Sequence, residues 1–171
     1  VSPTVYEAIF TADTNSTAAG TVSLAANEYT DNSLNPGAGG SLATKITIDT
    51  LAPTVAITSN PSKLAASETA TIQFQFNEPM DATSIQLGDF IAANGTLSSL
   101  SGSGTTWTAT FTPDADFDGN GAITLSNAAV QDAAGNWNNQ TFSLSPVLDI
   151  DTLQPDAPAI TLVFDNVGPI N

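Results

Sequence analysis

Carboxylates are the side chains through which this sequence can do chemistry. The 171 residues hold 17 Asp and Glu against two cations, Lys45 and Lys63, with no Arg, no His and no Cys. Neither a Ser–His triad nor a zinc site built on His and Cys is within reach. Paired carboxylates can hydrolyse glycosides, but that needs a cleft around an acid of raised pKa, which short loops rich in Gly and Asn do not offer. We therefore expect that the protein is not an enzyme.

The charge balance also limits the partners of the protein. A formal net charge of −15 argues against nucleic acid, because phosphate binding needs Lys and Arg. It argues equally against anionic membrane surfaces, and no apolar run is long enough for membrane insertion. Two interpretations of the carboxylates remain open: a dilute acidic surface that keeps a secreted protein soluble, or the binding of divalent cations.

The chain repeats itself at a shift of about 101 residues. Residues 6–11 align with 107–112, and the same shift pairs Gly20 with Gly121, Val22 with Ile123, Leu24 with Leu125, Asp31 with Asp132 and Asn35 with Asn136. One gap later, residues 48–51 align with 150–153. We interpret residues 1–49 as the C-terminal half of one repeat, 50–151 as a complete repeat and 152–171 as the start of a third. Asp-Thr-Leu-x-Pro segments form the joints.

Apolar and polar residues alternate with the period of a β-strand. The alternation and the turn signals between the runs predict seven strands in the complete repeat, at residues 55–58, 69–77, 84–92, 96–100, 106–112, 122–126 and 141–148. A core is expected from Phe74, Phe76, Trp107, Phe111, Ile123 and Leu125. Seven short strands in about a hundred residues predict an all-β chain of tandem immunoglobulin-like antiparallel β-sandwiches.

That topology predicts where carboxylates meet. The start of the first strand, the loop after the second strand and the loop before the last strand share one end of the sandwich. Asp49 lies in the joint, Glu78 in the second of these loops, and Asp132 with Asn136 in the third. Without Arg nearby, converging carboxylates favour a bound calcium ion, which takes six to eight oxygen ligands in loose geometry. Asp31 keeps the same place in the preceding copy.

The opposite end carries a second acidic stretch. Asp114, Asp116 and Asp118 alternate as at the start of an EF-hand loop, but position twelve is Leu125 and strands flank the loop, so an EF-hand is rejected. A calcium site with Asp151 of the next joint as co-ligand and an exposed acidic turn are both compatible with this pattern.

Several motifs together resemble a known family. The segments that carry the resemblance are Asp49-Thr50-Leu51-Ala52-Pro53, Phe76-Asn77-Glu78-Pro79-Met80, residues 106–113 and Asp132-Ala133-Ala134-Gly135-Asn136. This combination resembles the bacterial immunoglobulin-like repeats of giant type-I-secreted (RTX-type) adhesins and biofilm proteins. The resemblance implies an extracellular extender at the bacterial cell surface, which holds a distal binding domain away from the cell and binds calcium where adjacent repeats meet. The first copy departs from the pattern at residues 31–35.

Two other functions compete with the extender. Trp137 is placed where it could stack on a sugar in a glycan-binding module, although the first copy has Pro36 there. The first copy also lacks the first four strands, which leaves Phe10, Val22 and Leu24 without a covering sheet. Either the chain is a part of a longer polymer, or another copy of the chain supplies the missing strands, as in an extracellular filament joined by strand exchange.

Overall fold

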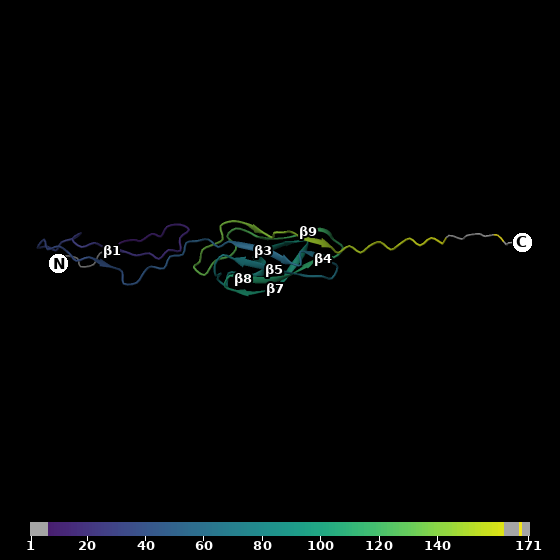
Figure 1. The fold of residues 1–171 in the computed structure, drawn as a ribbon, viewed down its shortest axis with the longest axis horizontal. Coiled ribbons are helices and arrows are strands. Elements are labelled where there is room, and N and C mark those ends of the chain that lie inside the picture. Colours follow the sequence, from purple (N-terminus) through teal and green to yellow (C-terminus); the bar gives the residue numbers. More distant parts are fainter. Residues whose placement is uncertain (1–6, 163–167, 169–171) are drawn as a thin grey trace.

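The two copies and the C-terminal segment follow one another along the long axis of the molecule (Figure 1). The computed structural model describes residues 7–162 and residue 168. Apart from one 3-10 turn, Leu87–Asp89, every regular element in these residues is a strand, so the predicted all-β class is confirmed. Across this described part, no helix has the length and apolar character needed to cross a membrane.

One sheet of the complete repeat has four antiparallel strands. They are β3 (Val55–Asn60), β5 (Ala70–Phe76), β8 (Thr106–Pro113) and β7 (Gly95–Ser103), in that order. Every second residue of β5 is buried and the others are exposed. This alternation arises because successive side chains point to opposite faces of a pleated strand. The sheet therefore presents one apolar face to the interior and a Thr- and Gln-rich face to solvent.

The second sheet is built around β9 (Asp118–Leu125). β6 (Phe90–Ala93) pairs with β9, and β10 (Phe142–Ser143) and β11 (Leu148–Asp151) also pair with it. The short strand β4 (Lys63–Ala65) continues this sheet by pairing with β11, and this pair is parallel. The two sheets give the antiparallel sandwich that the alternation predicted, with this one parallel addition.

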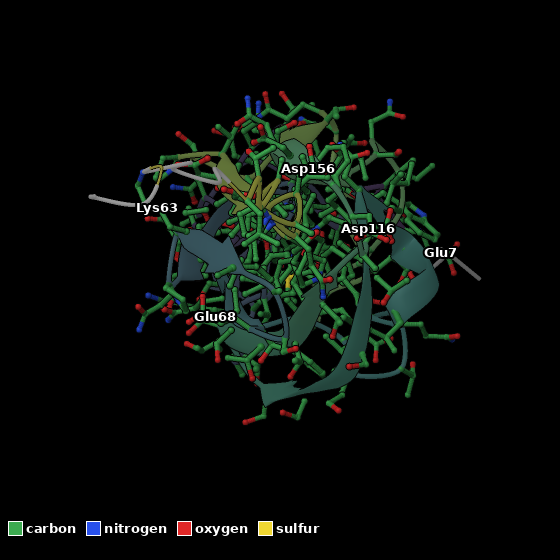
Figure 2. The ribbon with its side chains drawn as sticks, turned by 90° about the vertical axis from the view of Figure 1, so that its right-hand side faces the viewer. Glu7, Lys63, Glu68, Asp116 and Asp156 are labelled. Atoms are coloured by element: carbon green, nitrogen blue, oxygen red, sulfur yellow. The ribbon has the colours of Figure 1, made fainter. Side chains whose placement is uncertain are left out.

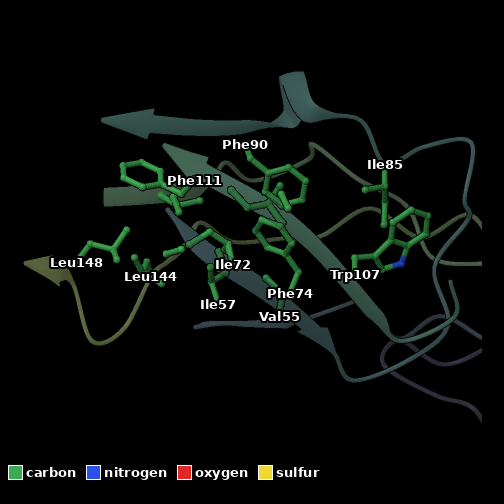
Figure 3. Close-up of a cluster of buried hydrophobic side chains, with 14 of the residues drawn as sticks. Val55, Ile57, Ile72, Phe74, Ile85, Phe90, Trp107, Phe111, Leu144 and Leu148 are labelled. Atoms are coloured by element: carbon green, nitrogen blue, oxygen red, sulfur yellow. The ribbon is translucent and has the colours of Figure 1, made fainter. Parts of the chain in front are cut away.

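The core lies between the two sheets (Figure 3). All six residues that were expected there are buried, and Phe74, Phe111, Ile123 and Leu125 are fully enclosed. Phe74 and Phe90 are in ring contact, with centroids 4.1 Å apart. Burial of side chains of this size stabilises the fold by about 1.5–3 kcal/mol each.

Two predicted strands differ from the observed ones. Residues 84–92 were expected as one strand, but the chain makes the 3-10 turn first and β6 follows, because the Asp89 carboxylate accepts the Gln86 N–H at 2.6 Å and closes a tight turn. Residues 141–148 were expected as one strand and are divided into β10 and β11. Pro146 lies between them and has no N–H to donate to a ladder.

The first copy keeps the pairing register of the complete repeat. Its strands β1 (Ser23–Leu24) and β2 (Gly40–Ser41) pair Leu24 with Gly40, as Leu125 pairs with Phe142. Gly20 bridges Ile46 as Gly121 pairs with Leu148. The structural equivalence of these pairs supports the sequence alignment of the two copies.

Candidate metal centre at the joint

Three carboxylates converge where the first copy meets the complete repeat. Asp49, Glu78 and Asp132 each place one carboxylate oxygen within 4.8 Å of the others, and among the described residues no other set of three acidic side chains does so. Asp132 is buried, and the other two are half-buried. The residues come from the joint, from the segment after β5 and from the loop after β9. The structure therefore brings together the three carboxylates that the topology placed at one end.

Asp132 is fixed by the loop that carries it. Its Oδ1 accepts the N–H groups of Ala134 at 2.8 Å and Asn136 at 2.9 Å, and its Oδ2 accepts the Asn136 side-chain amide at 2.8 Å. The Ala133 N–H donates to the Pro79 carbonyl oxygen at 3.0 Å. Because Pro79 follows Glu78 directly, this bond ties the two loops that supply carboxylates.

Asn77 connects the end of the joint to Glu78, a role that the sequence analysis did not predict. Its Oδ1 accepts the Thr54 N–H at 2.6 Å, and its own N–H donates to the Thr54 carbonyl at 3.1 Å. Its side-chain amide donates to Glu78 Oε1 at 3.0 Å. The signal in the sequence was the Asn-Glu-Pro turn at the end of a strand, where Asn side chains commonly bond to backbone.

Asn136 spans the boundary between the two copies. Its side-chain amide donates both to Asp132 Oδ2 and, at 3.2 Å, to the backbone carbonyl of Asp49. Asp49 Oδ1 in turn accepts the Leu51 N–H at 3.2 Å. The amide group of Asn136 thus positions the cluster, and metal ligation by its amide oxygen stays a prediction.

The cluster is electrostatically unfavourable without a cation. Burial raises the pKa of Glu78 above its ordinary value, and the nearby Asp132 and Asp49 carboxylates raise that pKa further, against the lowering effect of Asn77. Lys63 is engaged elsewhere, since it forms an ion pair with Asp149 at 2.7 Å and lies on β4 near the other end of the sandwich (Figure 1). A divalent cation would relieve the mutual repulsion of the three carboxylates.

The second predicted site is not assembled in the same way. Figure 2 faces the C-terminal end of the molecule, where Glu68 and Asp116 lie apart from one another. Asp151 lies opposite Asp118 in the β9–β11 register, but Asp114, Asp116, Asp118 and Asp151 do not form a group of three with oxygens within 4.8 Å. By its repeat position Asp151 is the counterpart of Asp49. Calcium binding by these four residues stays a prediction.

Asp31 adopts the same turn as Asp132. Its Oδ1 accepts the N–H groups of Ser33 at 2.8 Å and Asn35 at 2.9 Å, and its Oδ2 accepts the Asn35 side-chain amide at 2.9 Å. The hydrogen bonds from Asn35 hold the pKa of Asp31 below its ordinary value. Leu34 takes a φ of 65° where Gly135 has 94°. The departure of the first copy from the motif therefore leaves the turn intact.

Trp137, the candidate for sugar stacking, follows Asn136 and is half-exposed. Its backbone forms a β-bridge with Gln131, so the base of the loop is fixed while part of the indole ring reaches solvent.

Comparison with known proteins identifies one family. The family model described as a bacterial Ig-like domain matches residues 49–147, a segment that contains Asp49, Glu78 and Asp132. No curated protein and no solved structure matches the chain.

Proposed function

Because the chain belongs to the bacterial Ig-like domain family, we propose that it is a structural extender of a large cell-surface adhesin, stiffened by calcium at the joints between repeats. The observation that carries this proposal is the meeting of Asp49, Glu78 and Asp132 within 4.8 Å at the boundary of two copies. Such domains supply length and spacing rather than catalysis, and the elongated arrangement of the copies suits that role (Figure 1).

Calcium fits the donors better than other common cations. Three carboxylates, with carbonyl oxygens and water to complete the shell, match its preference for six to eight oxygen ligands. Magnesium demands near-ideal octahedral geometry and keeps several waters, so a wide cluster from three separate segments suits it less. Zinc favours nitrogen and sulfur ligands, and the chain has neither His nor Cys.

The stiffening follows from the origin of the ligands. Asp49 closes the first copy, whereas Glu78 and Asp132 belong to the complete repeat. An ion shared among them links two bodies that otherwise meet through a short connection. Without it, the carboxylates repel by roughly 1–4 kcal/mol per pair, according to the local dielectric. We therefore expect a bent, variable joint without calcium and a straight one with it.

Small-angle X-ray scattering of the chain with millimolar calcium and with a chelator tests this proposal. Calcium is expected to shift the distribution of interatomic distances toward the extended arrangement of Figure 1. Glu78→Gln should lose this response. Glu28→Gln is the matched control, because Glu28 is exposed in the first copy and belongs to no cluster. An identical distance distribution in calcium and in chelator would contradict the stiffened joint.

A second candidate function rests on the open face of the first copy. Phe10, Val22 and Leu24 are 43%, 42% and 50% exposed, whereas their counterparts in the complete repeat, Phe111, Ile123 and Leu125, are fully buried. Strands that precede residue 1 in a longer chain would bury this face, and so would strands from another copy of the chain, which would join subunits into a filament. Light scattering over a range of protein concentrations tests it: a mass that stays monomeric at high concentration would contradict strand exchange.

A further inference from the structure

The second residue of each joint is a threonine that is hydrogen-bonded to the acidic loop of the copy before it. Thr50 Oγ1 donates to the Asp13 carbonyl at 2.6 Å and accepts the Ser16 N–H at 2.9 Å. The Thr50 N–H donates to the Ser16 carbonyl at 2.9 Å. The joint residue is thus held to the first copy by both its side chain and its backbone.

The complete repeat makes the same contacts with a different loop sequence. Thr152 Oγ1 donates to the Asp114 carbonyl at 2.8 Å and accepts the Phe117 N–H at 2.9 Å, while the Thr152 N–H donates to the Phe117 carbonyl at 2.8 Å. Thr152 is buried. All of these bonds reach backbone atoms of the loop, so they do not depend on which side chains the loop carries. We call this arrangement the threonine clamp.

The clamp sits next to the residue that enters the cluster. Asp49 lies between Ile48 of the first copy and the clamped Thr50. Its carboxylate accepts the Leu51 N–H at 3.2 Å and meets Glu78 and Asp132. Leu153 donates to Asp151 in the same way at 3.3 Å. The clamp therefore fixes the Asp49 carboxylate relative to the body of the first copy.

We propose that Thr50 is a positioning residue that transmits metal binding at the joint to the preceding repeat. This inference rests on the proposed function, because it concerns how the bound ion stiffens the joint. Thr50 does not belong to the carboxylate cluster, so its hydroxyl should matter little for calcium affinity. Without the clamp, Asp49 would still bind the ion, but on a tether that lets the first copy swing.

Removing the Thr50 hydroxyl without changing the size of the side chain tests whether joint stiffness and calcium affinity are separable. The absence of Cys allows spin labels at Ser41→Cys and Ser98→Cys, one exposed position in each copy. Electron-paramagnetic-resonance distance measurements would follow the joint, and calorimetry would follow calcium binding. In Thr50→Val, calcium should no longer narrow the distance distribution, while the Kd stays within about threefold, less than 1 kcal/mol. Thr50→Ser should restore the narrowing.

Thr152→Val is the matched control. It removes the same bonds in the second copy, where Asp151 belongs to no cluster of three, so calcium should still narrow the distribution. A Thr50→Val distribution that narrows as fully as wild type would overturn the inference, and so would a Thr50→Val chain that no longer binds calcium. A wild-type chain that binds no calcium would instead overturn the proposed function, and the inference with it.

A measurement on the wild-type chain covers the case in which Thr50→Val does not fold. The Ser16 amide belongs to the clamp and lies in the first copy, and Ser16 is not a member of the carboxylate cluster. Calcium should slow hydrogen exchange at this amide if the clamp transmits binding. Exchange at Ser16 that is equal with and without calcium would overturn the inference.

Discussion

Substitution of Glu78 by Gln should stabilise the fold in the absence of calcium and destabilise it, relative to wild type, in its presence. The substitution keeps the size of the side chain and leaves an acceptor for the Asn77 amide, whose bond to Glu78 Oε1 is 3.0 Å long. It removes one of three charges that lie within 4.8 Å of one another. Without calcium, Glu78→Gln therefore relieves repulsion, and with calcium it removes a ligand.

The size of each effect follows from the geometry. Two charges separated by 4.8 Å repel by about 1 kcal/mol in a water-like dielectric and more in a half-buried site. Loss of two such pairs, each weakened by salt, should stabilise the metal-free chain by roughly 1–2 kcal/mol. Calcium at a hundred times its Kd should stabilise wild type by about 2.7 kcal/mol, and the variant by much less.

Thermal unfolding in chelator and in calcium measures both effects. A change of 1 kcal/mol corresponds to about 4–8 °C in Tm for a domain of this size. The variant should melt above wild type in chelator and below it in calcium. Glu28→Gln should follow wild type in both conditions. If Glu78→Gln lowers Tm equally with and without calcium, the side chain is a structural element and the metal-site reasoning is refuted.

Three further predictions concern other parts of the structure. Burial raises the pKa of Glu78 above its ordinary value of 4.5, so in the metal-free fold the Glu78 carboxyl holds its proton to higher pH than in the unfolded chain, and the free energy of unfolding should fall as the pH rises through that raised pKa. Urea melts over a range of pH should show this fall in wild type relative to Glu78→Gln, and equal slopes of unfolding free energy against pH in the two chains would contradict it. Leu34→Gly should stabilise the turn of the first copy by about 1 kcal/mol, since Leu34 is 80% exposed and has a φ of 65°; faster hydrogen exchange at Asn35 would contradict this. Asn138→Ala should cost about 2–4 kcal/mol, because the buried Asn138 side chain bonds to the backbone of Ala129, Val130, Ser126 and Gln140; an unchanged urea midpoint would refute that role.

The repeat and the strand alternation were sufficient to predict the fold. Residues such as Phe74 and Ile123 are placed by a period of two that the sandwich must satisfy, so their burial follows from the pattern alone. The meeting of Asp49, Glu78 and Asp132 was predictable for a related reason. Which loops share an end of a sandwich is a property of topology and does not depend on side-chain detail.

The arrangement of the acidic loop at the other end does not follow from the sequence pattern. Asp114, Asp116 and Asp118 alternate in sequence, which would place them on one face of an extended strand. In the structure Asp116 has a φ of 52°, in the left-handed region, and β9 begins only at Asp118. The backbone therefore turns between them. Such a turn depends on loop conformation, which an alternating pattern does not specify.

Contacts that depend on the backbone conformation could also not be predicted from the sequence. Strand β4 has three residues, too few to show an alternation, and it was not predicted. The threonine clamp consists of bonds from Thr50 and Thr152 to loop backbone atoms, whose positions no composition reveals. The repetition of Asp-Thr-Leu at each joint was the one available signal. It was interpreted as the joint itself, and the hydroxyl was not singled out.

The most direct test is to crystallise the chain in millimolar calcium and record anomalous diffraction. The proposed function predicts a peak for an ion among the carboxylates of Asp49, Glu78 and Asp132, with oxygen distances of about 2.3–2.6 Å. Carboxylates turned apart toward solvent, with no ion between them, would contradict the calcium-stiffened joint and leave the β-sandwich fold unaffected.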